Sequence, residues 1–409
     1  MDVQKKYPFL LVTNFFGVLN DNFLKTITGF LAISWVAQDI VGVVISAAAG
    51  ALVLPYVFLS PLAGVLAKKY DRKTIVKWGK IAELPIMALS IIGYVLQNPW
   101  IILSSILCMG IQSCLFSPAK YSLVRDICGE EKLSQGMGMM EGISFLGMLT
   151  GTVLAAFIAE DTQDLSTLYV LLMSFAIIGL AFSYFIPKVK VQQVEEESND
   201  SIRPIKSLVT NWKNANKYKG LNTTTIVLSV FWWLVASLQI GLVIYCNQIM
   251  GLSSTKTGIL LSFAAIGISI GSIISGYIFK NNYRKASVVI SGLIVSICSL
   301  FIFFHQMTFT PFAITLVIMA ISAGFFKVPL DTSLQQKAKG SFLSIALAMF
   351  NQVSFIFILL ASATMSLISL FLESTYLFLV LGIVFIATNL YILLTNTIFE
   401  KNKKNFEKR

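Results

Sequence analysis

A polar group stands in the middle of an apolar stretch near the start of the chain. The stretch spans residues 9–35 and contains Asn20, Asp21, Asn22 and Lys25. Charged and amide side chains are costly in hydrocarbon, so in a membrane span they usually face the interior of a helix bundle or a water-filled path. The four-residue spacing places Asp21 and Lys25 on one helix face, where pairing lowers the cost of burying both charges. The group is therefore either a structural ion pair or a polar patch that contacts, or gates the passage of, a charged or zwitterionic solute.

Three further charged residues could face the same path. Glu83 and Glu141 each lie within an apolar segment, and Lys120 lies at the end of another. Each carboxylate is either a helix-packing group bonded to a neighbouring helix or an anion that meets a cationic headgroup or a proton. Lys120 is either a lysine that extends its charge to the membrane surface or a cation that lines the inner mouth of the path.

Three amides in the second half of the chain add neutral hydrogen-bonding groups. Gln239 lies in the middle of one apolar segment, and Asn351 and Gln352 lie together in another. Such amides either bond neighbouring helices to one another or form a neutral wall of the path.

A short charged loop joins two apolar segments at residues 64–73. It contains Gly64, Lys68, Asp71 and Arg72. A glycine allows two helices to approach closely, and the charged residues can bridge to neighbouring helix ends. We interpret this loop as a conformational latch rather than as a site of chemistry.

The motifs of enzymes and metal sites are missing from the sequence. It contains no P-loop, no GxSxG, no HExxH and no Cys/His metal cluster. The five cysteines are scattered without ligand spacing, so we interpret them as small core residues. We therefore expect no enzyme activity, no cofactor and no metal, and any transport must use an ion gradient or the gradient of the substrate itself.

The composition indicates a membrane protein. Of the 409 residues, 56% are hydrophobic and only 12% are charged, whereas a soluble globular chain usually carries about 25% charged residues. The mean hydropathy is +0.78. The net charge is +11, but the charges sit in short loops between apolar segments, so we attribute them to membrane orientation and not to nucleic-acid binding.

The elements that must position these residues are twelve predicted membrane helices. We predict an all-α fold with spans near residues 8–35, 40–67, 74–97, 99–121, 133–159, 166–187, 222–248, 255–280, 285–306, 310–331, 341–371 and 375–399. Asp21 is about 13 residues into the first span, which is roughly 20 Å deep at 1.5 Å per residue. Basic residues gather in alternate loops, and Lys256 is the single cation in the others. By the positive-inside rule, both termini are cytoplasmic and the first helix is retained.

Four regions follow from this pattern. Residues 1–187 form an N-terminal six-helix half, 188–221 a cytoplasmic linker, 222–400 a C-terminal six-helix half, and 401–409 a basic cytoplasmic tail. The linker is either a solvated connection or, in part, a helix on the membrane surface.

The two halves repeat one another. Residues 64–73 match 276–285, residues 118–123 match 329–334, and residues 141–145 match 351–355, at offsets of 212, 211 and 210 residues. Two parallel six-helix halves related by a pseudo-two-fold axis are typical of major facilitator transporters, whose substrates bind near the midplane between the halves.

Several motifs narrow this further, and they extend over nearly the whole chain. They are Phe16-Gly-Val-Leu-Asn20-Asp21-Asn22, Ser117-Pro-Ala-Lys120-Tyr121, Gly138-Met-Met-Glu141, Ser229-Val-Phe-Trp232 and Gly324-Phe-Phe-Lys-Val-Pro329-Leu. On these motifs the chain resembles the bacterial lysophospholipid transporters of the major facilitator superfamily. In the superfamily an acidic residue usually stands near position 68, where this chain has Lys68, and Asp71 takes its place.

The resemblance implies a flippase that moves lysophospholipids, mainly lysophosphatidylethanolamine, from the outer to the inner leaflet of the bacterial inner membrane. It implies a partner acyl-ACP synthetase/acyltransferase that reacylates them, and we expect the transporter itself to be a monomer among membrane lipids. Asp21, Lys120 and Glu141 fall on polar positions of the family. Family members can carry an arginine where this chain has Gln239, so an Asp–Arg gate is missing and we expect Asp21 to pair with Lys25.

Two other functions fit the same residues. One is a proton-coupled exporter of amphipathic drugs or small solutes, in which Glu83 and Glu141 carry the proton. The other is a non-transporting sensor or a scaffold for an acyltransferase.

Overall fold

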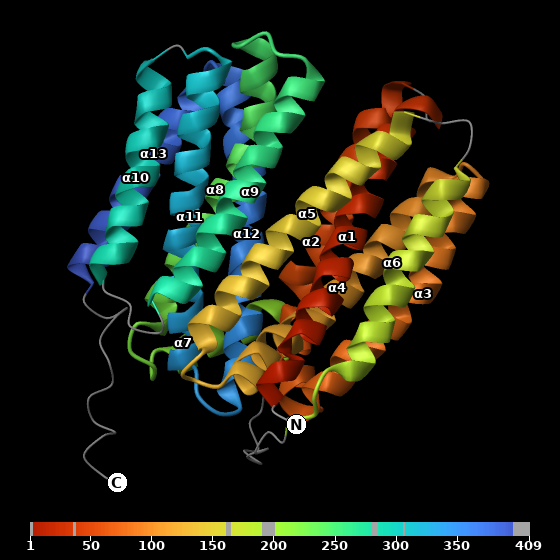
Figure 1. The fold of residues 1–409 in the computed structure, drawn as a ribbon, viewed down its shortest axis with the longest axis vertical. Helices are drawn as coiled ribbons and strands as arrows, with labels where there is room; N and C mark the ends of the chain where they lie inside the picture. The colour runs from red at the N-terminus through yellow and green to blue at the C-terminus, as the bar shows by residue number, and fades with distance from the viewer. Residues whose placement is uncertain are drawn as a thin grey trace. The chain divides into compact units, whose positions relative to one another are not determined.

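All regular structure in the described part of the chain is helical. The computed structural model describes residues 3–35, 38–160, 165–189, 201–279, 285–305 and 307–395. Within these ranges it contains thirteen α-helices and one short 3₁₀ helix (Figure 1). The predicted basic tail 401–409, residues 280–284 of the repeated loop and residues 190–200 of the predicted linker lie outside the described residues.

Contacts between Cα atoms divide the chain into two compact units, and each unit takes in a short segment from the other half of the sequence. Unit 1 comprises Met1–Glu130, Met139–Asn211 and Lys339–Phe355. Unit 2 comprises Glu131–Gly138, Trp212–Ala338 and Ile356–Arg409. The beginning of one helix from the second half of the sequence therefore packs within unit 1, and the beginning of one from the first half packs within unit 2.

The helices of unit 1 come mainly from the first half of the sequence. They are η1 (Val3–Lys6), α1 (Tyr7–Trp35), α2 (Gln38–Lys69), α3 (Arg72–Val95), α4 (Pro99–Cys128), most of α5 (Leu133–Glu160), α6 (Ser166–Phe185), and the first parts of α7 (Pro204–Ala215) and α12 (Phe342–Phe371).

The helices of unit 2 come mainly from the second half. They are α8 (Leu221–Gln248), α9 (Ser254–Phe279), α10 (Lys285–Phe304), α11 (Phe309–Lys337), α13 (Tyr376–Leu394), and the remaining parts of α5, α7 and α12.

The same helix neighbours recur in both units. In unit 1, α2 and α3 pack on α4, while α1 packs on α2, α4 and α6, and α3 also packs on α6. In unit 2, α9 and α10 pack on α11, while α8 packs on α9, α11 and α13, and α10 also packs on α13. Each pair in one unit has its counterpart in the other, as the internal sequence repeat predicts.

Helix ends follow local sequence signals. Asn98 caps α4 by accepting hydrogen bonds from the backbone of Trp100 and Ile101, and Pro99 occupies the first helical position, where no backbone donor is needed. Gly129 ends α4 with a φ of +70°, a conformation that glycine adopts at low cost. The helix thus extends seven residues past the end predicted at residue 121.

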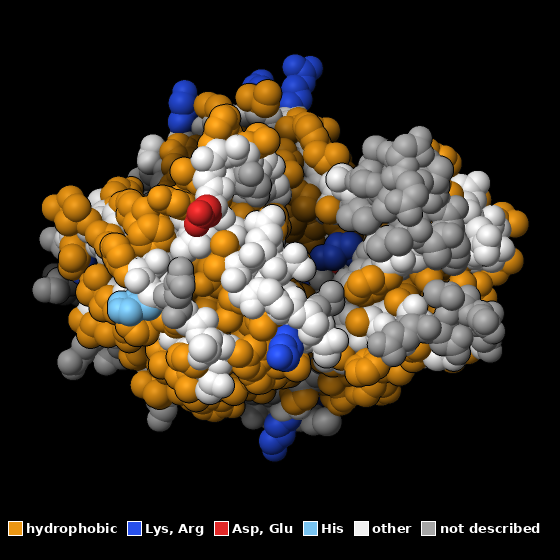
Figure 2. All heavy atoms as spheres, turned by 90° about the horizontal axis from the view of Figure 1, so that it is seen from above, with side chains coloured by type: hydrophobic (Ala, Val, Ile, Leu, Met, Phe, Trp, Pro, Cys, Tyr) orange, Lys and Arg blue, Asp and Glu red, His pale blue; other side chains and the backbone are white. Residues whose placement is uncertain are grey.

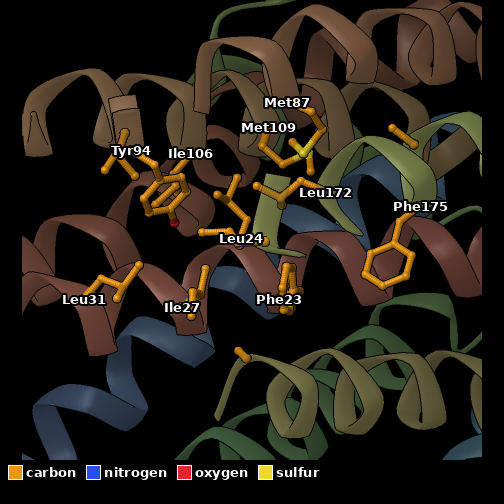
Figure 3. Packing of buried hydrophobic residues seen from close by; sticks show 14 of the residues in the cluster. Phe23, Leu24, Ile27, Leu31, Met87, Tyr94, Ile106, Met109, Leu172 and Phe175 are labelled. Atoms are coloured by element: carbon orange, nitrogen blue, oxygen red, sulfur yellow. The ribbon is translucent and has the colours of Figure 1, made fainter. Parts of the chain in front are cut away.

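The core of unit 1 is an apolar cluster between α1, α3, α4 and α6 (Figure 3). Phe23, Ile27 and Met87 are fully buried in it. The Tyr94 hydroxyl, the polar end of an otherwise apolar contact, lies 2.8 Å from the hydroxyl of Thr28. This cluster holds α1 against α3, and so fixes the side of α1 on which Asn20 lies.

The surface is unusually apolar. Figure 2 shows one face on which hydrophobic side chains cover wide areas and charged side chains stand singly. Many large hydrophobic side chains are exposed, including Phe157 (66%) and Phe371 (77%). Ten of the described helices are long and apolar enough to cross a membrane. The two other long helices, α1 and α3, which were predicted as spans but are not among these ten, carry the buried polar groups discussed below.

Candidate functional site

Asp21 and Ser113 form the centre of the candidate site. The Ser113 hydroxyl of α4 donates to Oδ2 of Asp21 on α1 at 2.8 Å. Asp21 is partly exposed and Ser113 is buried. A carboxylate held by a hydroxyl on one side keeps further lone pairs available for a cationic ligand.

The described contacts of Lys25 include no hydrogen bond or close ion pair with Asp21, although the Asp21 charge attracts the Lys25 ammonium group. Its ammonium group instead donates to Oδ1 of Asn22 at 3.4 Å, and Asn22 donates to the Val18 carbonyl at 2.8 Å. Asp21 bonds to the Ser113 hydroxyl of α4, a partner on a neighbouring helix that spacing within α1 cannot reveal.

Asn20 joins a buried ion pair on α3. Lys80 Nζ lies 2.6 Å from Oε2 of Glu83, and the two side chains are 0% and 1% exposed. Asn20 Nδ2 donates to Oε1 of the same carboxylate at 2.8 Å. Both oxygens of Glu83 are therefore occupied, which favours the packing interpretation of this residue over that of a proton carrier.

Two glycines make room for the Lys80 side chain. A methyl group at Gly17 of α1 would lie 2.8 Å from Lys80 Nζ, and one at Gly179 of α6 would lie 3.1 Å from it. The ammonium group thus occupies a notch between α1 and α6, and the ion pair ties three helices of unit 1 together.

Lys120 and Glu141 are both buried in unit 1. Lys120 Nζ lies 5.1 Å from the centre of the Phe116 ring and 4.9 Å from that of Tyr121, distances at which a cation is attracted to an aromatic ring. Glu141 and Asp21 attract this ammonium group electrostatically. Lys120 is 7% exposed, whereas a lysine that extends its charge to the membrane surface would have an exposed ammonium group.

The predicted amides have different environments. Asn351 is buried and donates to the Ser117 hydroxyl at 2.9 Å, and Gln352 donates to the Val57 carbonyl at 2.8 Å. Both contacts lie within unit 1, because this part of α12 packs there. Gln239 belongs to unit 2 and is exposed there.

The residues of the charged loop bind to neighbouring helices. Asp71 caps α3 by accepting from the backbone and hydroxyl of Thr74. Arg72 is buried and donates to Asp126 at the end of α4, and its Nη2 also lies 3.4 Å from the Ser344 hydroxyl. Lys68 is only partly exposed.

Gly64 allows α2 and the beginning of α12 to come close together. A methyl group at Gly64 would lie 2.7 Å from Cβ of Ala348. The repeat-related glycine makes the matching contact in unit 2, where a methyl group at Gly276 would lie 3.1 Å from Cα of Gly138.

Unit 2 contains a buried ion pair that the sequence reasoning missed. Lys327 Nζ lies 2.5 Å from Oδ2 of Asp331 on the same helix, with the side chains 1% and 5% exposed. The ammonium group is also 5.8 Å from the ring centre of Phe231 and 5.4 Å from that of Trp232. The four-residue spacing of Lys327 and Asp331 in an apolar span is the signal that could have revealed the pair.

Lys80 and Ser113 were also missed. Lys80 stands three residues before Glu83, a spacing that allows pairing on a helix, so the sequence did contain a signal for it. Ser113 is one hydroxyl among many in the spans, and nothing in its spacing marks it.

The described residues contain no group of His, Cys, Asp or Glu side chains arranged to hold a metal ion. What they contain is two sets of membrane-length helices with repeated packing, each with ionisable groups inside it. This combination defines the class of the protein, a multi-pass membrane transporter.

Comparison with known families gives the same class. The chain belongs to the Major Facilitator Superfamily, whose family model matches residues 13–362. Both the predicted all-α fold and the resemblance to this superfamily are thereby confirmed.

The relatives that match the chain carry a more specific name than that of the superfamily. The chain is 25% identical over 344 residues to a protein of Photorhabdus laumondii named lysophospholipid transporter LplT, with 81% of this chain and 80% of the relative covered. It is 27% identical over 300 residues to the protein of the same name from Yersinia enterocolitica, covering 71% of this chain and 70% of the relative.

Solved structures share the fold. The human organic anion transporter MFSD10 superposes with a TM-score of 0.73 at 16% identity, covering 96% of this chain and 99% of that one. The Escherichia coli fucose:proton symporter FucP gives a TM-score of 0.75 at 14% identity, covering 95% of this chain and 98% of that one.

Proposed function

We propose that this protein is a lysophospholipid transporter. The observation that carries the proposal is the similarity to two relatives with that name, which extends over 80% and 70% of their lengths. The candidate site adds a chemical reason, because it combines anionic and cationic groups inside a membrane helix bundle.

A zwitterionic headgroup needs both signs of charge. Asp21 and Glu141 supply carboxylates for an ammonium group, and Lys120 supplies a cation for a phosphate. The two carboxylates already attract Lys120. When a phosphoethanolamine group binds, its ammonium takes the place of Lys120 beside the carboxylates, and its phosphate becomes the partner of Lys120. Asn22, Lys25 and Asn351 add polar groups along the path, and Gln239 adds a neutral one on α8.

The proposed movement is from the outer to the inner leaflet of the bacterial inner membrane, with both termini in the cytoplasm. The halves 1–187 and 222–400, joined by the linker 188–221, alternate around the substrate, and the loop with Gly64, Lys68, Asp71 and Arg72 latches one state. A monomer delivers the lysophospholipid to an acyl-ACP synthetase/acyltransferase, which reacylates it.

The test is uptake of radiolabelled lysophosphatidylethanolamine by spheroplasts that lack their own lysophospholipid transport. We expect uptake with the wild-type chain, strong loss with Asp21→Asn, and wild-type uptake with Ser104→Ala, a control at an exposed serine bonded to its own helix. If the wild-type protein shows no uptake, the proposed function is wrong. If Asp21→Asn takes up as much as the wild type, only the proposed role of the Asp21 carboxylate is wrong.

A second arm separates the alternatives. Purified protein in liposomes should move lysophosphatidylethanolamine without a proton gradient, and a protonophore should leave the rate unchanged. A rate that collapses with the protonophore indicates the proton-coupled exporter instead, and no movement in pure liposomes indicates a scaffold.

A further inference from the structure

The apolar side of helix α7 is exposed at Ile205 and Val209 and partly exposed at Leu208 and Trp212. Ile205, Leu208, Val209 and Trp212 follow the spacing i, i+3, i+4 and i+7, so they share one face of the helix. Ile205 is 81% exposed and Val209 is 49% exposed. A soluble protein would bury such a face. Its exposure here indicates that something other than water covers it.

The side of α7 that packs on the protein is small and polar. Ser207, Asn211 and Ala215 follow the spacing i, i+4 and i+8, and all three are buried. Asn211 donates to the Ser207 hydroxyl at 2.9 Å, which satisfies both groups within this buried side. The apolar face is therefore not the one that attaches the helix to its neighbours.

Both ends of α7 are tied to the helix bundle. Gln352 Nε2 of α12 donates to the Pro204 carbonyl at 3.3 Å within unit 1, and Asn222 Nδ2 of α8 donates to the Trp212 carbonyl at 3.0 Å within unit 2. The second contact holds α7 beside the first turn of α8, which begins at Leu221, whereas Gln352 lies ten residues into α12. We place α7 at the membrane surface because it packs where the span α8 begins.

Cations flank the apolar face. Lys206 and Lys213 are exposed and seven residues apart, so they lie on one side of the helix next to Ile205 and Val209. Residues 201–222 contain five basic residues and no acidic one, the basic ones being Arg203, Lys206, Lys213, Lys217 and Lys219. An apolar face beside a row of cations is complementary to the boundary between acyl chains and anionic headgroups.

We infer that α7 is a docking surface for anionic phospholipids at the cytoplasmic face of the membrane. Ile205, Leu208, Val209 and Trp212 enter the acyl region, Lys206 and Lys213 contact the headgroup phosphates, and the Ser207–Ala215 side stays on the protein. The linker is then an in-plane membrane anchor between the two halves. The inference does not depend on the identity of the transported solute.

The test measures the depth of single nitroxide labels at Ile205, Val209, Lys206 and Lys213 in the full-length protein, with Cys108 replaced by serine. The protein is reconstituted in equimolar phosphatidylethanolamine and phosphatidylglycerol, or with phosphatidylcholine in place of phosphatidylglycerol. We expect the labels at 205 and 209 to be accessible to oxygen and shielded from a water-soluble nickel complex, and those at 206 and 213 to show the reverse. Replacement of the anionic lipid should raise nickel accessibility at 205 severalfold.

A charge variant supplies the control. In Lys206→Gln with Lys213→Gln, the label at 205 should lose its dependence on phosphatidylglycerol, whereas Lys256→Gln, which removes an exposed cation from α9, should keep it. Nickel access at 205 in phosphatidylglycerol membranes overturns the inference, as does the same depth in both lipid mixtures. Shielding of 205 from both reagents assigns the face to a protein contact and overturns it as well.

Discussion

Arg72 at the start of α3 donates from Nη1 to both carboxylate oxygens of Asp126 near the end of α4, at 2.7 and 2.5 Å. The side chains are only 5% and 13% exposed. Removal of both charges from water offsets much of their attraction, but one of them left alone is strongly destabilising. The pair therefore fixes the charged loop to the end of α4, 54 residues further along the chain.

Asp126→Ala should lower the free energy of unfolding by about 3–5 kcal/mol, because it leaves the Arg72 charge buried and unpaired. The measurement is the melting temperature of the purified protein in detergent. The matched control is Glu130→Ala, since Glu130 pairs with Arg125 at the same end of α4 but is 73% exposed. An exposed pair contributes about 0–1 kcal/mol, and equal shifts for the two variants would contradict the prediction.

Apolar periodicity predicted most of the membrane-length helices, and the internal repeat predicted that the same helix neighbours recur in both units. Apolar segments of membrane length determine where spans occur, and the matches of residues 64–73 and 141–145 with the second half determine that the spans repeat. The helix α7 was left open because its 12 residues are too short for a span and too mixed in composition to decide.

Spacing was less informative about partners. It identified Asp21 and Lys25 as residues on one face, yet Asp21 bonds to Ser113 of α4. The sequence of α1 does not show which helix lies beside that face or which hydroxyl group that helix presents to it. Spacing shows that two residues of one helix can pair, as Lys80 and Glu83 do, but not whether they will, and it gives no information on pairs between helices such as Arg72 with Asp126.

For the Lys80–Glu83 ion pair of unit 1, we predict that the effects of two substitutions on stability are not additive. Lys80→Met should destabilise the protein by about 3–5 kcal/mol, because Glu83 is left charged in an apolar site. Adding Glu83→Gln should recover most of that loss, since the amide keeps an acceptor for Asn20 and carries no charge. Melting temperatures of the two single variants and the double variant form the cycle. Additive losses would show that the two side chains act independently.

The hydroxyl of Ser113 is predicted to position the Asp21 carboxylate. A hydrogen bond to a charged group contributes about 1.5–3 kcal/mol, so Ser113→Ala should reduce uptake of lysophosphatidylethanolamine by about tenfold or more. Ser113→Thr, which keeps a hydroxyl, should retain most of the uptake. The melting temperature should fall in Ser113→Ala, which takes the donor from Asp21, and stay close to that of the wild type in Ser113→Thr. Uptake is compared at equal amounts of folded protein, and equal loss in Ser113→Thr and Ser113→Ala would argue against the hydrogen bond.

In unit 2 the Lys327–Asp331 pair leads to a similar expectation. Lys327→Met removes the ammonium group that lies 2.5 Å from the buried Asp331 carboxylate and should cost about 3–5 kcal/mol of stability. Lys339→Met removes an exposed cation just after α11 and should cost less than about 0.5 kcal/mol. The two melting temperatures are compared in the same detergent. A wild-type melting temperature for Lys327→Met would mean that Asp331 finds another partner or becomes protonated.

The close contact of α2 with α12 predicts a rescue by a smaller side chain. Gly64→Ala should destabilise by about 1–3 kcal/mol, because its methyl group would lie 2.7 Å from Cβ of Ala348. Adding Ala348→Gly removes that atom, so part of the loss should return. Gly258→Ala is the control, since no atom lies within 4 Å of the added methyl group, and replacing a helical glycine should stabilise by up to about 1 kcal/mol.

The matching contact in unit 2 should not be rescuable in the same way. A methyl group at Gly276 would lie 2.7 Å from the carbonyl oxygen of Ser134, and a backbone atom cannot be removed by substitution. Gly276→Ala should therefore destabilise as Gly64→Ala does, while no change at position 138 relieves it, because Gly138 has no side chain to lose. The melting temperatures of Gly64→Ala and Gly276→Ala, with and without Ala348→Gly, decide the point. Ala348→Gly should raise the first and lower the second, because a glycine inside a helix costs about 1 kcal/mol. A rise in both would mean that it acts through α12 as a whole and not through the contact with Gly64.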